Sequence, residues 1–230
     1  MKIDIKKIPI IILTTKNNSV RHNDLSKTFD GWYNIHYYYN DTPSNWIKQI
    51  PCSAGHIRCI KKGLELGAPF LVLEDDVFMT DNFDNIIDVP DNSDMIYLGV
   101  SNKGVDFKNN IDCWDADTLS YKSIENYNHL VKLNNMLSAH AIIYVNSVAA
   151  YNCGLILLES IMNNGFSDCW IANSLSLMNV YCYRKPLFYQ GGSTNKQLMI
   201  ETTSIILDKD KTDIDYSANR STLSNKLLFS

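Results

Sequence analysis

The chain has 230 residues, of which 45% are hydrophobic and 20% are charged, and its formal net charge is −4. This composition is ordinary for a globular protein, and the length suits a single domain with a sizeable core. The negative net charge argues against a dedicated nucleic-acid binder, which normally presents a basic face. No stretch of the sequence approaches the roughly 18 consecutive apolar residues of a membrane span.

The first half of the chain alternates short apolar runs with amphipathic segments. Apolar runs bounded by turn residues are typical of buried strands, and apolar residues three and four apart are typical of helices. Ser53 is expected to cap a helix that ends near Gly67. Strands are expected over 8–15, 33–39 and 70–76, and helices over 19–29 and 53–67.

The second half continues the same alternation after a polar segment. Residues 100–135 have no clear pattern and are expected to form loops that face substrate. Strands are expected over 94–99, 138–145 and 180–183, and helices over 147–161 and 167–177, the latter capped by Ser167. Strands that alternate with helices predict an α/β fold with a mostly parallel sheet flanked by helices. The tail after 196 is expected to be partly extended or mobile.

The most informative feature is the apolar run 71–73, which ends in Glu74, Asp75 and Asp76. Ligands of open α/β sheets bind beyond the carboxyl ends of the strands. Side chains alternate along a strand, so Glu74 and Asp76 are expected on one side and Asp75 on the other. Two converging carboxylates repel one another unless a cation lies between them, and hard oxygen ligands suit Mg²⁺, Mn²⁺ or Ca²⁺. The alternative is an acidic loop after a core strand.

Several nucleotide-handling classes can be excluded by their missing motifs. The chain has no Gly-Lys dipeptide, which a P-loop requires, and no G-x-G-x-x-G or G-x-S-x-G motif. A receiver domain would carry its acid pair after the first strand, where this chain has Thr14 and Thr15. A nucleotide-diphosphate site organised by a metal is the class that remains.

Six cysteines are present, and the charged N-terminal segment is unlike a signal peptide. Reduced thiols are therefore expected, in a cytoplasmic protein of a microbe or a large virus. Cys52 and His56, four residues apart, could face one another on a helix and ligate a metal. A buried, inert cysteine is the more usual case.

Seven segments, in order along most of the chain, resemble glycosyltransferase family 25, which includes lipooligosaccharide and collagen galactosyltransferases. The most specific of them is L-E-D-D-V. The segments are Ile11-Ile12-Leu13 with Arg21, Cys52-Ser53-Ala54-Gly55-His56, Leu73-Glu74-Asp75-Asp76-Val77, Met95-Ile96-Tyr97-Leu98-Gly99, Ala139-His140-Ala141-Ile142-Ile143-Tyr144 with Ala149, Phe166-Ser167-Asp168-Cys169-Trp170, and Tyr183-Arg184-Lys185-Pro186-Leu187-Phe188-Tyr189-Gln190 with Ser193. Gly55 stands where the family usually has a serine.

The resemblance implies an A-type glycosyltransferase fold, a UDP-sugar donor, Mn²⁺ (or Mg²⁺) and inversion at the anomeric carbon. Glu74 and Asp76 match the family's metal and nucleotide carboxylates, whereas Asp75 either binds sugar hydroxyls or is structural. Inversion needs a base that takes the acceptor proton. Asp168 is the best candidate for that base, and its alternative role is a helix cap.

Other residues are candidates for weaker reasons. The candidates for binding the nucleotide are Thr14, Arg21, His56, Gln190 and Ser193. His140 on a buried strand is more often a satisfied core histidine. Trp170 is expected in the core, while Trp46 and Trp114 lie in loops where they could stack on sugars.

Two functions of different classes follow. The first is an active, metal-dependent hexosyltransferase of a single domain, in which 1–99 mainly binds the nucleotide-sugar, 136–195 mainly serves acceptor and catalysis, and 196–230 is a tail. The second is a catalytically weak nucleotide-sugar-binding or scaffold domain of the same fold. The acceptor would be a glycan hydroxyl or hydroxylysine in a collagen-like peptide, and the lack of a secretion signal favours the glycan.

Overall fold

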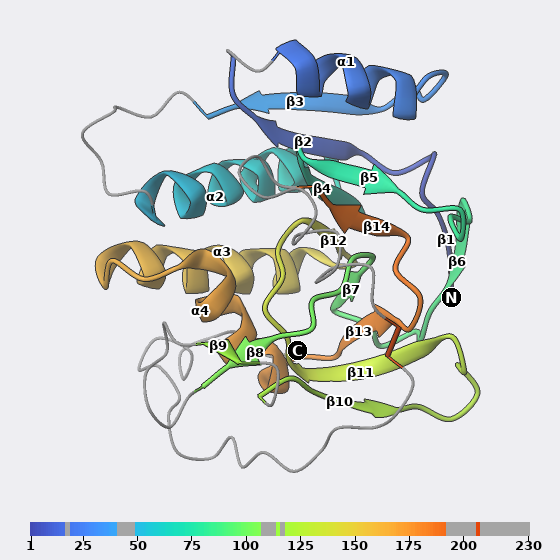
Figure 1. Cartoon of the computed structure of the whole chain (residues 1–230), viewed down its shortest axis with the longest axis vertical. Helices are drawn as coiled ribbons and strands as arrows, with labels where there is room; N and C mark the ends of the chain where they lie inside the picture. Colours follow the sequence, from blue (N-terminus) through green and yellow to red (C-terminus); the bar gives the residue numbers. More distant parts are fainter. Residues whose placement is uncertain (17–18, 41–48, 107–113, 116–117, 192–205, 208–230) are drawn as a thin grey trace.

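The structure is a computed structural model that describes residues 1–16, 19–40, 49–106, 114–115, 118–191 and 206–207. For 19–20, 22–24, 49 and 114–115 it describes the backbone alone. These residues form an α/β fold around one large sheet (Figure 1).

The central sheet has eight strands and mixes local with distant connections. Their order across the sheet is β10 (Ser120–Ser123), β11 (Leu130–Asn135), β13 (Val180–Tyr183), β7 (Met95–Tyr97), β12 (Ala141–Tyr144), β4 (Phe70–Glu74), β2 (Ile10–Thr14) and β3 (Ile35–Tyr39). β2 pairs in parallel with both β3 and β4, and β13 pairs in parallel with β7. β11 and β12 run opposite to the other strands of this sheet. The predicted α/β class and the mostly parallel strand direction are therefore confirmed.

Helices cover one face of the sheet almost completely. α2 (Gln49–Leu66) and α3 (Ser147–Met162) lie side by side over this face, and α4 (Ser167–Ser174) continues the layer into the 3₁₀ turn η1 (Leu175–Leu177) (Figure 1). Apolar residues from β2, β4, β7 and β12 pack there against α2 and α3, among them Ile11, Val72, Met95 and Ile142. Burial of this apolar surface is the main stabilising term for the sheet.

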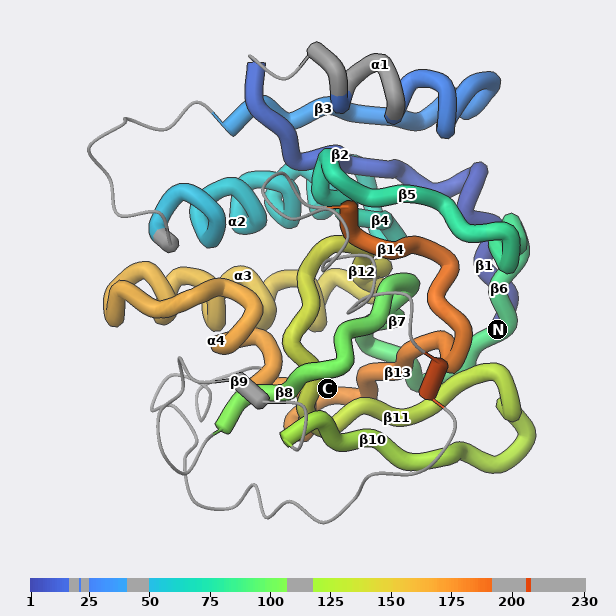
Figure 2. The backbone as a smooth tube through the Cα atoms, in the orientation of Figure 1, coloured from blue at the N-terminus to red at the C-terminus, as the bar shows by residue number. Residues whose placement is uncertain are grey.

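The other face is covered by α1 (Ser19–Thr28) and short strands, as the backbone trace shows (Figure 2). Three two-stranded ladders complete the fold: β1 (Lys2–Asp4) with β6 (Ile86–Asp88), β5 (Val77–Met79) with β14 (Phe188–Gln190), and β8 (Gly104–Val105) with β9 (Trp114–Asp115). The β5–β14 ladder is important for the site, because it brings Gln190 opposite Val77, directly after the acidic residues.

Four sequence-based expectations need correction. The helix expected from Ser53 begins at Gln49, so its first turn contains Pro51. Proline is tolerated there because the N–H groups of a first turn have no helical partner. Ser53 lies inside that helix, where its hydroxyl is 2.8 Å from the hydroxyl of Ser160 on α3. The strand expected over 70–76 ends at Glu74 in a turn.

The second pair of corrections concerns later segments. The N-cap of α4 is Phe166, without a side-chain cap bond, rather than Ser167. The polar segment 100–135 contributes β10 and β11 to the central sheet, where Tyr121, Leu130, Val131 and Leu133 are buried. Cross-strand pairing on both sides of β11 outweighs its weak sequence signal. No helix among the described residues is both long and apolar enough to cross a bilayer.

Candidate functional site

Three carboxylates gather where β4 ends, and we call Glu74, Asp75 and Asp76 the acid turn. Leu71 and Leu73 of β4 are buried, and Glu74 is the last residue of this strand, so it lies at the carboxyl edge of the sheet. The backbone N–H of Glu74 donates to the carbonyl of His140 on the neighbouring chain segment at 2.9 Å. As predicted, Glu74 and Asp76 share one side, since the Gln190 amide reaches both of them.

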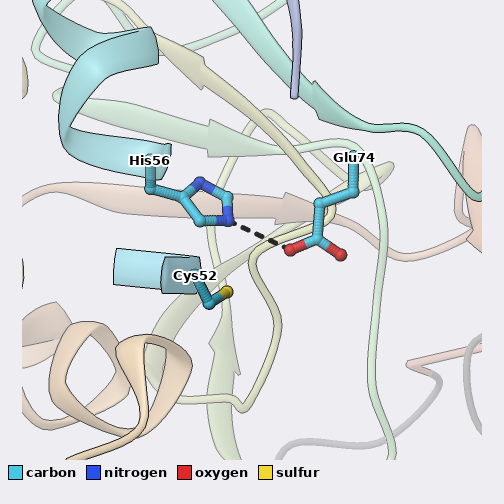
Figure 3. Close-up of side chains that lie close together, drawn as sticks. All are labelled: Cys52, His56 and Glu74. Atoms are coloured by element: carbon cyan, nitrogen blue, oxygen red, sulfur yellow. Dashed lines mark hydrogen bonds and ion pairs between the residues drawn. The ribbon is translucent and has the colours of Figure 1, made fainter. Parts of the chain in front are cut away.

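Glu74 is held from two directions by long-range partners. Its Oε1 lies 3.0 Å from Nε2 of His56 on α2, as Figure 3 shows. Its Oε2 accepts a hydrogen bond of 2.8 Å from the side-chain amide of Gln190 on β14. The same amide nitrogen lies 3.4 Å from Oδ1 of Asp76, which is a weaker contact. Both oxygens of Glu74 are therefore oriented before any ligand binds.

Asp75 is anchored by partners from β2 and α1. Its Oδ2 accepts a hydrogen bond of 2.7 Å from the Thr14 hydroxyl at the end of β2. Its Oδ1 forms an ion pair with Nη1 of Arg21 on α1. The second nitrogen of Arg21, Nη2, lies 3.9 Å from Oδ2 of Asp76. Because both oxygens of Asp75 have partners, the arrangement favours the structural alternative, in which Asp75 positions Arg21.

The acid turn carries more negative charge than its neighbours neutralise. Burial and the charge of Glu74 raise the pKa of Asp76 to about 6, although Arg21 acts in the opposite direction. Burial also works against ionisation of Glu74, but the hydrogen bond and charge of His56 outweigh it and lower the pKa of that carboxyl. Repulsion within the acid turn is therefore felt most at Asp76.

Asp168 lies in the first turn of α4, close enough to Glu74 and His56 to be affected by their charges. Burial and the negative charge of Glu74 raise its pKa to about 6, whereas His56 acts in the opposite direction. Its Oδ1 accepts the backbone N–H of Cys169 at 3.0 Å. Because the N-cap of the helix is Phe166, the alternative role of Asp168 as a helix cap is not supported.

The sulfur atom of Cys52 lies close to His56 and Glu74. Cys52 and His56 project from successive turns of α2, and with Glu74 they form what we call the Cys–His–Glu cluster (Figure 3). One ligand atom from each residue lies within 4.8 Å of the other two. The sulfur of Cys52 also lies 3.3 Å from the hydroxyl of Ser167. Burial alone would lower the pKa of His56, but its contacts with Cys52 and Glu74 outweigh burial and raise it.

His140 has the surroundings of a core residue. Its side chain is buried, with Nδ1 2.9 Å from the Ser138 hydroxyl and Nε2 packed against Gly99. Burial lowers the pKa of His140, although the charge of Glu74 and the backbone of Phe188 act in the opposite direction. His140 directly precedes β12, and its buried Nε2 has no hydrogen-bond partner among the described residues, so only Nδ1 matches the expectation of a satisfied core histidine.

One of the remaining candidates lies in the core, and the others lie outside the residues that the structure describes. Trp170 is buried, as expected. Ser193, Trp46 and the side chain of Trp114 lie outside the described residues. None of the five cysteines that the structure describes forms a disulfide, and they are Cys52, Cys59, Cys153, Cys169 and Cys182.

A cavity of about 600 Å³ opens elsewhere, between β6 and the end of β13. Asp84, Asp88, Tyr183 and Arg184 are among its lining residues. No residue of the acid turn lines it, so this cavity is separate from the candidate site.

Most residues of the candidate site were predicted from the sequence, but the importance of Cys52 was underestimated. Cys52 was expected to be an inert, buried thiol, yet it is half-buried beside His56. The signal was its spacing of four residues from His56, which places both side chains on one helix face.

No family model matches the sequence, and no match is found among characterised proteins. Among solved structures, the chain is similar to CTP:phosphocholine cytidylyltransferase (LicC) from Streptococcus pneumoniae, with 12% identity and a TM-score of 0.43. The similarity covers 80% of this chain and 74% of the other. The resemblance to glycosyltransferase family 25 therefore remains a prediction, and the functional argument depends on the residues of this chain.

Proposed function

We propose that this protein is a metal-dependent, inverting glycosyltransferase that moves a hexose from a UDP-sugar to a hydroxyl acceptor. The observation that carries the proposal is the acid turn at the carboxyl edge of the sheet, with Arg21 paired to Asp75 and with Asp168 near enough to be affected by the charge of Glu74. A crevice at this edge is where open α/β sheets bind ligands. The family resemblance along the same residues supports the finer assignment to glycosyl transfer.

The residues of the acid turn fit a hard divalent cation. Burial and the charge of Glu74 raise the pKa of Asp76, and a cation beside it would relieve that repulsion. Carboxylate oxygens are the ligands that Mg²⁺ and Mn²⁺ prefer. Asp76, together with Glu74, would hold the ion. When bound, it would neutralise negative charge on the departing diphosphate.

The chain's own side chains would bind and orient the donor. Arg21 has one guanidinium nitrogen paired with Asp75 and the other 3.9 Å from Asp76, so it would hold a positive charge beside the proposed diphosphate. The hydroxyl of Thr14 donates a hydrogen bond of 2.7 Å to Asp75 and so fixes the partner of Arg21. Gln190 keeps the side chain of Glu74 in one orientation. These contacts would preorganise the site before the donor arrives.

Asp168 would act as the general base. As the acceptor oxygen bonds to the anomeric carbon, its proton would pass to the Asp168 carboxylate, and the bond to the UDP oxygen would break on the opposite face. With its pKa raised to about 6, Asp168 would still be mostly ionised at neutral pH, and it would be a stronger base than an ordinary aspartate. A glycan hydroxyl is the acceptor that we favour over hydroxylysine.

The test offers a panel of UDP-sugars with Mn²⁺ and measures released UDP, first with water and then with mono- and disaccharides or hydroxylysine peptides. We expect release that needs metal and increases with a saccharide acceptor. Release that persists in EDTA would contradict the metal requirement. Binding of UDP-sugar without turnover would favour the alternative, a nucleotide-sugar-binding or scaffold domain, and transfer to the peptide alone would reverse the acceptor preference.

A further inference from the structure

We infer that the Cys–His–Glu cluster is a binding site for a thiophilic divalent cation of the Zn²⁺ type, which shares Glu74 with the acid turn but includes neither Asp75 nor Asp76. The cluster consists of Sγ of Cys52, a ring nitrogen of His56 and a carboxylate oxygen of Glu74 (Figure 3). The inference stands on the geometry and chemistry of these three groups. It does not depend on glycosyl transfer.

The spacing of the three groups suits one shared ion. Zn²⁺ binds nitrogen and carboxylate oxygen at about 2.0–2.1 Å, so two such ligands on a tetrahedral ion lie roughly 3.3 Å apart. Nε2 of His56 and Oε1 of Glu74 are separated by 3.0 Å, close to that value. All three ligand atoms lie within 4.8 Å of one another, so small rotations of the side chains would centre an ion between them.

The fold fixes two of the ligands on one rigid element. Cys52 and His56 are four residues apart on α2, so both side chains face the end of β4, which supplies Glu74. Ligands on a helix and a buried strand are held more precisely than ligands on loops. The hydroxyl of Ser167, 3.3 Å from the Cys52 sulfur, can donate to a thiolate and stabilise it as a ligand.

The donor set selects the kind of ion. A thiolate and an imidazole suit Zn²⁺, whereas Mg²⁺ and Mn²⁺ prefer oxygen ligands. Three protein ligands leave a fourth tetrahedral position for water. His56 is buried, but Cys52 is half-buried and the Glu74 side chain is 20% exposed, so an ion and a water have access.

Glu74 belongs both to this cluster and to the acid turn, and its two oxygens have different partners. Its Oε1 faces His56, while its Oε2 accepts the amide hydrogen of Gln190 at 2.8 Å. One carboxylate oxygen thus belongs to the sulfur-containing cluster, and the other faces the side on which Asp76 lies. Loss of Cys52 should therefore remove the soft site and leave the oxygen ligands of the acid turn in place.

The test uses the reduced, metal-free protein and the metals alone. We expect equilibrium dialysis to give one tightly bound Zn²⁺ per chain. We expect Co²⁺ to give visible bands of a tetrahedral site and a near-ultraviolet sulfur-to-cobalt charge-transfer band. Cys52→Ala should lower the affinity for Zn²⁺ at least about 100-fold, since even lost outer-shell partners cost 10–100-fold. It should also abolish the charge-transfer band.

Cys182→Ala is the matched control, because Cys182 is a buried thiol on β13 that lies outside the cluster. We expect it to leave Zn²⁺ affinity and the cobalt spectrum unchanged. Circular dichroism shows whether each variant is folded, and Cys52→Ser provides a second variant of nearly the same size. Zn²⁺ binding that is equal in the parent and in both Cys52 variants would overturn the inference. The absence of bound Zn²⁺ in the folded parent would leave His56 and Glu74 as a simple ion pair and would equally overturn it.

Discussion

The side-chain amide of Gln190 donates a hydrogen bond of 2.8 Å to the carboxylate of Glu74, although 116 residues separate them in the chain. The contact exists because β14 pairs with β5, the strand that follows the acid turn. It joins the last strand described in the structure to the centre of the candidate site. A neutral donor between Glu74 and Asp76 reduces their repulsion without neutralising it.

Replacing this donor should destabilise the metal-free protein. Gln190→Leu keeps much of the side-chain volume but leaves Glu74 without the amide, and a hydrogen bond to a charged group contributes about 1.5–3 kcal/mol. We expect a loss of that size in the free energy of unfolding, measured by urea titration, and partial recovery with Mn²⁺. Tyr189→Phe is the control, because it keeps the ring that stacks on Phe78. Equal effects of the two substitutions would show that Gln190 has no special role.

Asp76 should be necessary for metal-dependent nucleotide binding. UDP with Mn²⁺ at about 100 times the dissociation constant stabilises a protein by roughly 2.7 kcal/mol, which gives a clear rise in melting temperature. We expect Asp76→Ala to abolish that rise, while Asp81→Ala, an exposed aspartate beyond β5, retains it. A rise in the parent that is unchanged by EDTA would remove the basis for a metal at the acid turn.

Asp168→Asn should retain UDP binding and lose transfer. The amide has nearly the shape of the carboxylate but cannot accept the proton, and loss of a general base costs about 10²–10⁴-fold in rate. Because the pKa of Asp168 is raised to about 6, the parent's rate should fall as pH decreases through that value. The variant should lack this dependence. Turnover within a few-fold of the parent would exclude Asp168 as the base.

The same substitution should stabilise the metal-free protein at neutral pH. Burial and the charge of Glu74 raise the pKa of Asp168 from 3.8 to about 6, so the folded state resists its ionisation. A raised carboxyl pKa contributes stability at low pH that is lost as pH rises through the folded value. We expect Asp168→Asn to melt at least about 2 °C above the parent at pH 7.5. The difference should shrink toward pH 4.5, and a constant difference would contradict this origin.

Gly99 and His140 should be energetically coupled. A Cβ added to Gly99 would lie 1.8 Å from Nε2 of His140, so alanine cannot fit without movement. We expect Gly99→Ala to cost roughly 1–3 kcal/mol in unfolding free energy. The double variant with His140→Ala should lose less than the sum of the two single variants, because the smaller side chain makes room. Additive losses would show that the two residues do not share this packing contact.

The sequence by itself determined the α/β class and the main elements, because apolar periodicity reports which side chains must be buried. The run 71–73 is buried along its whole length, and so are the apolar residues of β2 and β12. The acid turn was also evident, since three carboxylates after a buried strand must meet at the sheet edge. Asp168 and Gln190 came instead from the resemblance to a family, which orders segments but does not place them in space.

Only the tertiary structure decided which of these side chains meet. Gln190 reaches Glu74 through a ladder between two three-residue strands, too short to give a periodic signal. β10 and β11 are stabilised as strands by pairing across the sheet. No local pattern in residues 100–135 predicted this pairing. Cys52 and His56 were visible as a spacing of four, but Glu74 joins them because α2 packs on β4. Contacts between distant segments depend on how the elements pack, and local sequence carries little information about that packing.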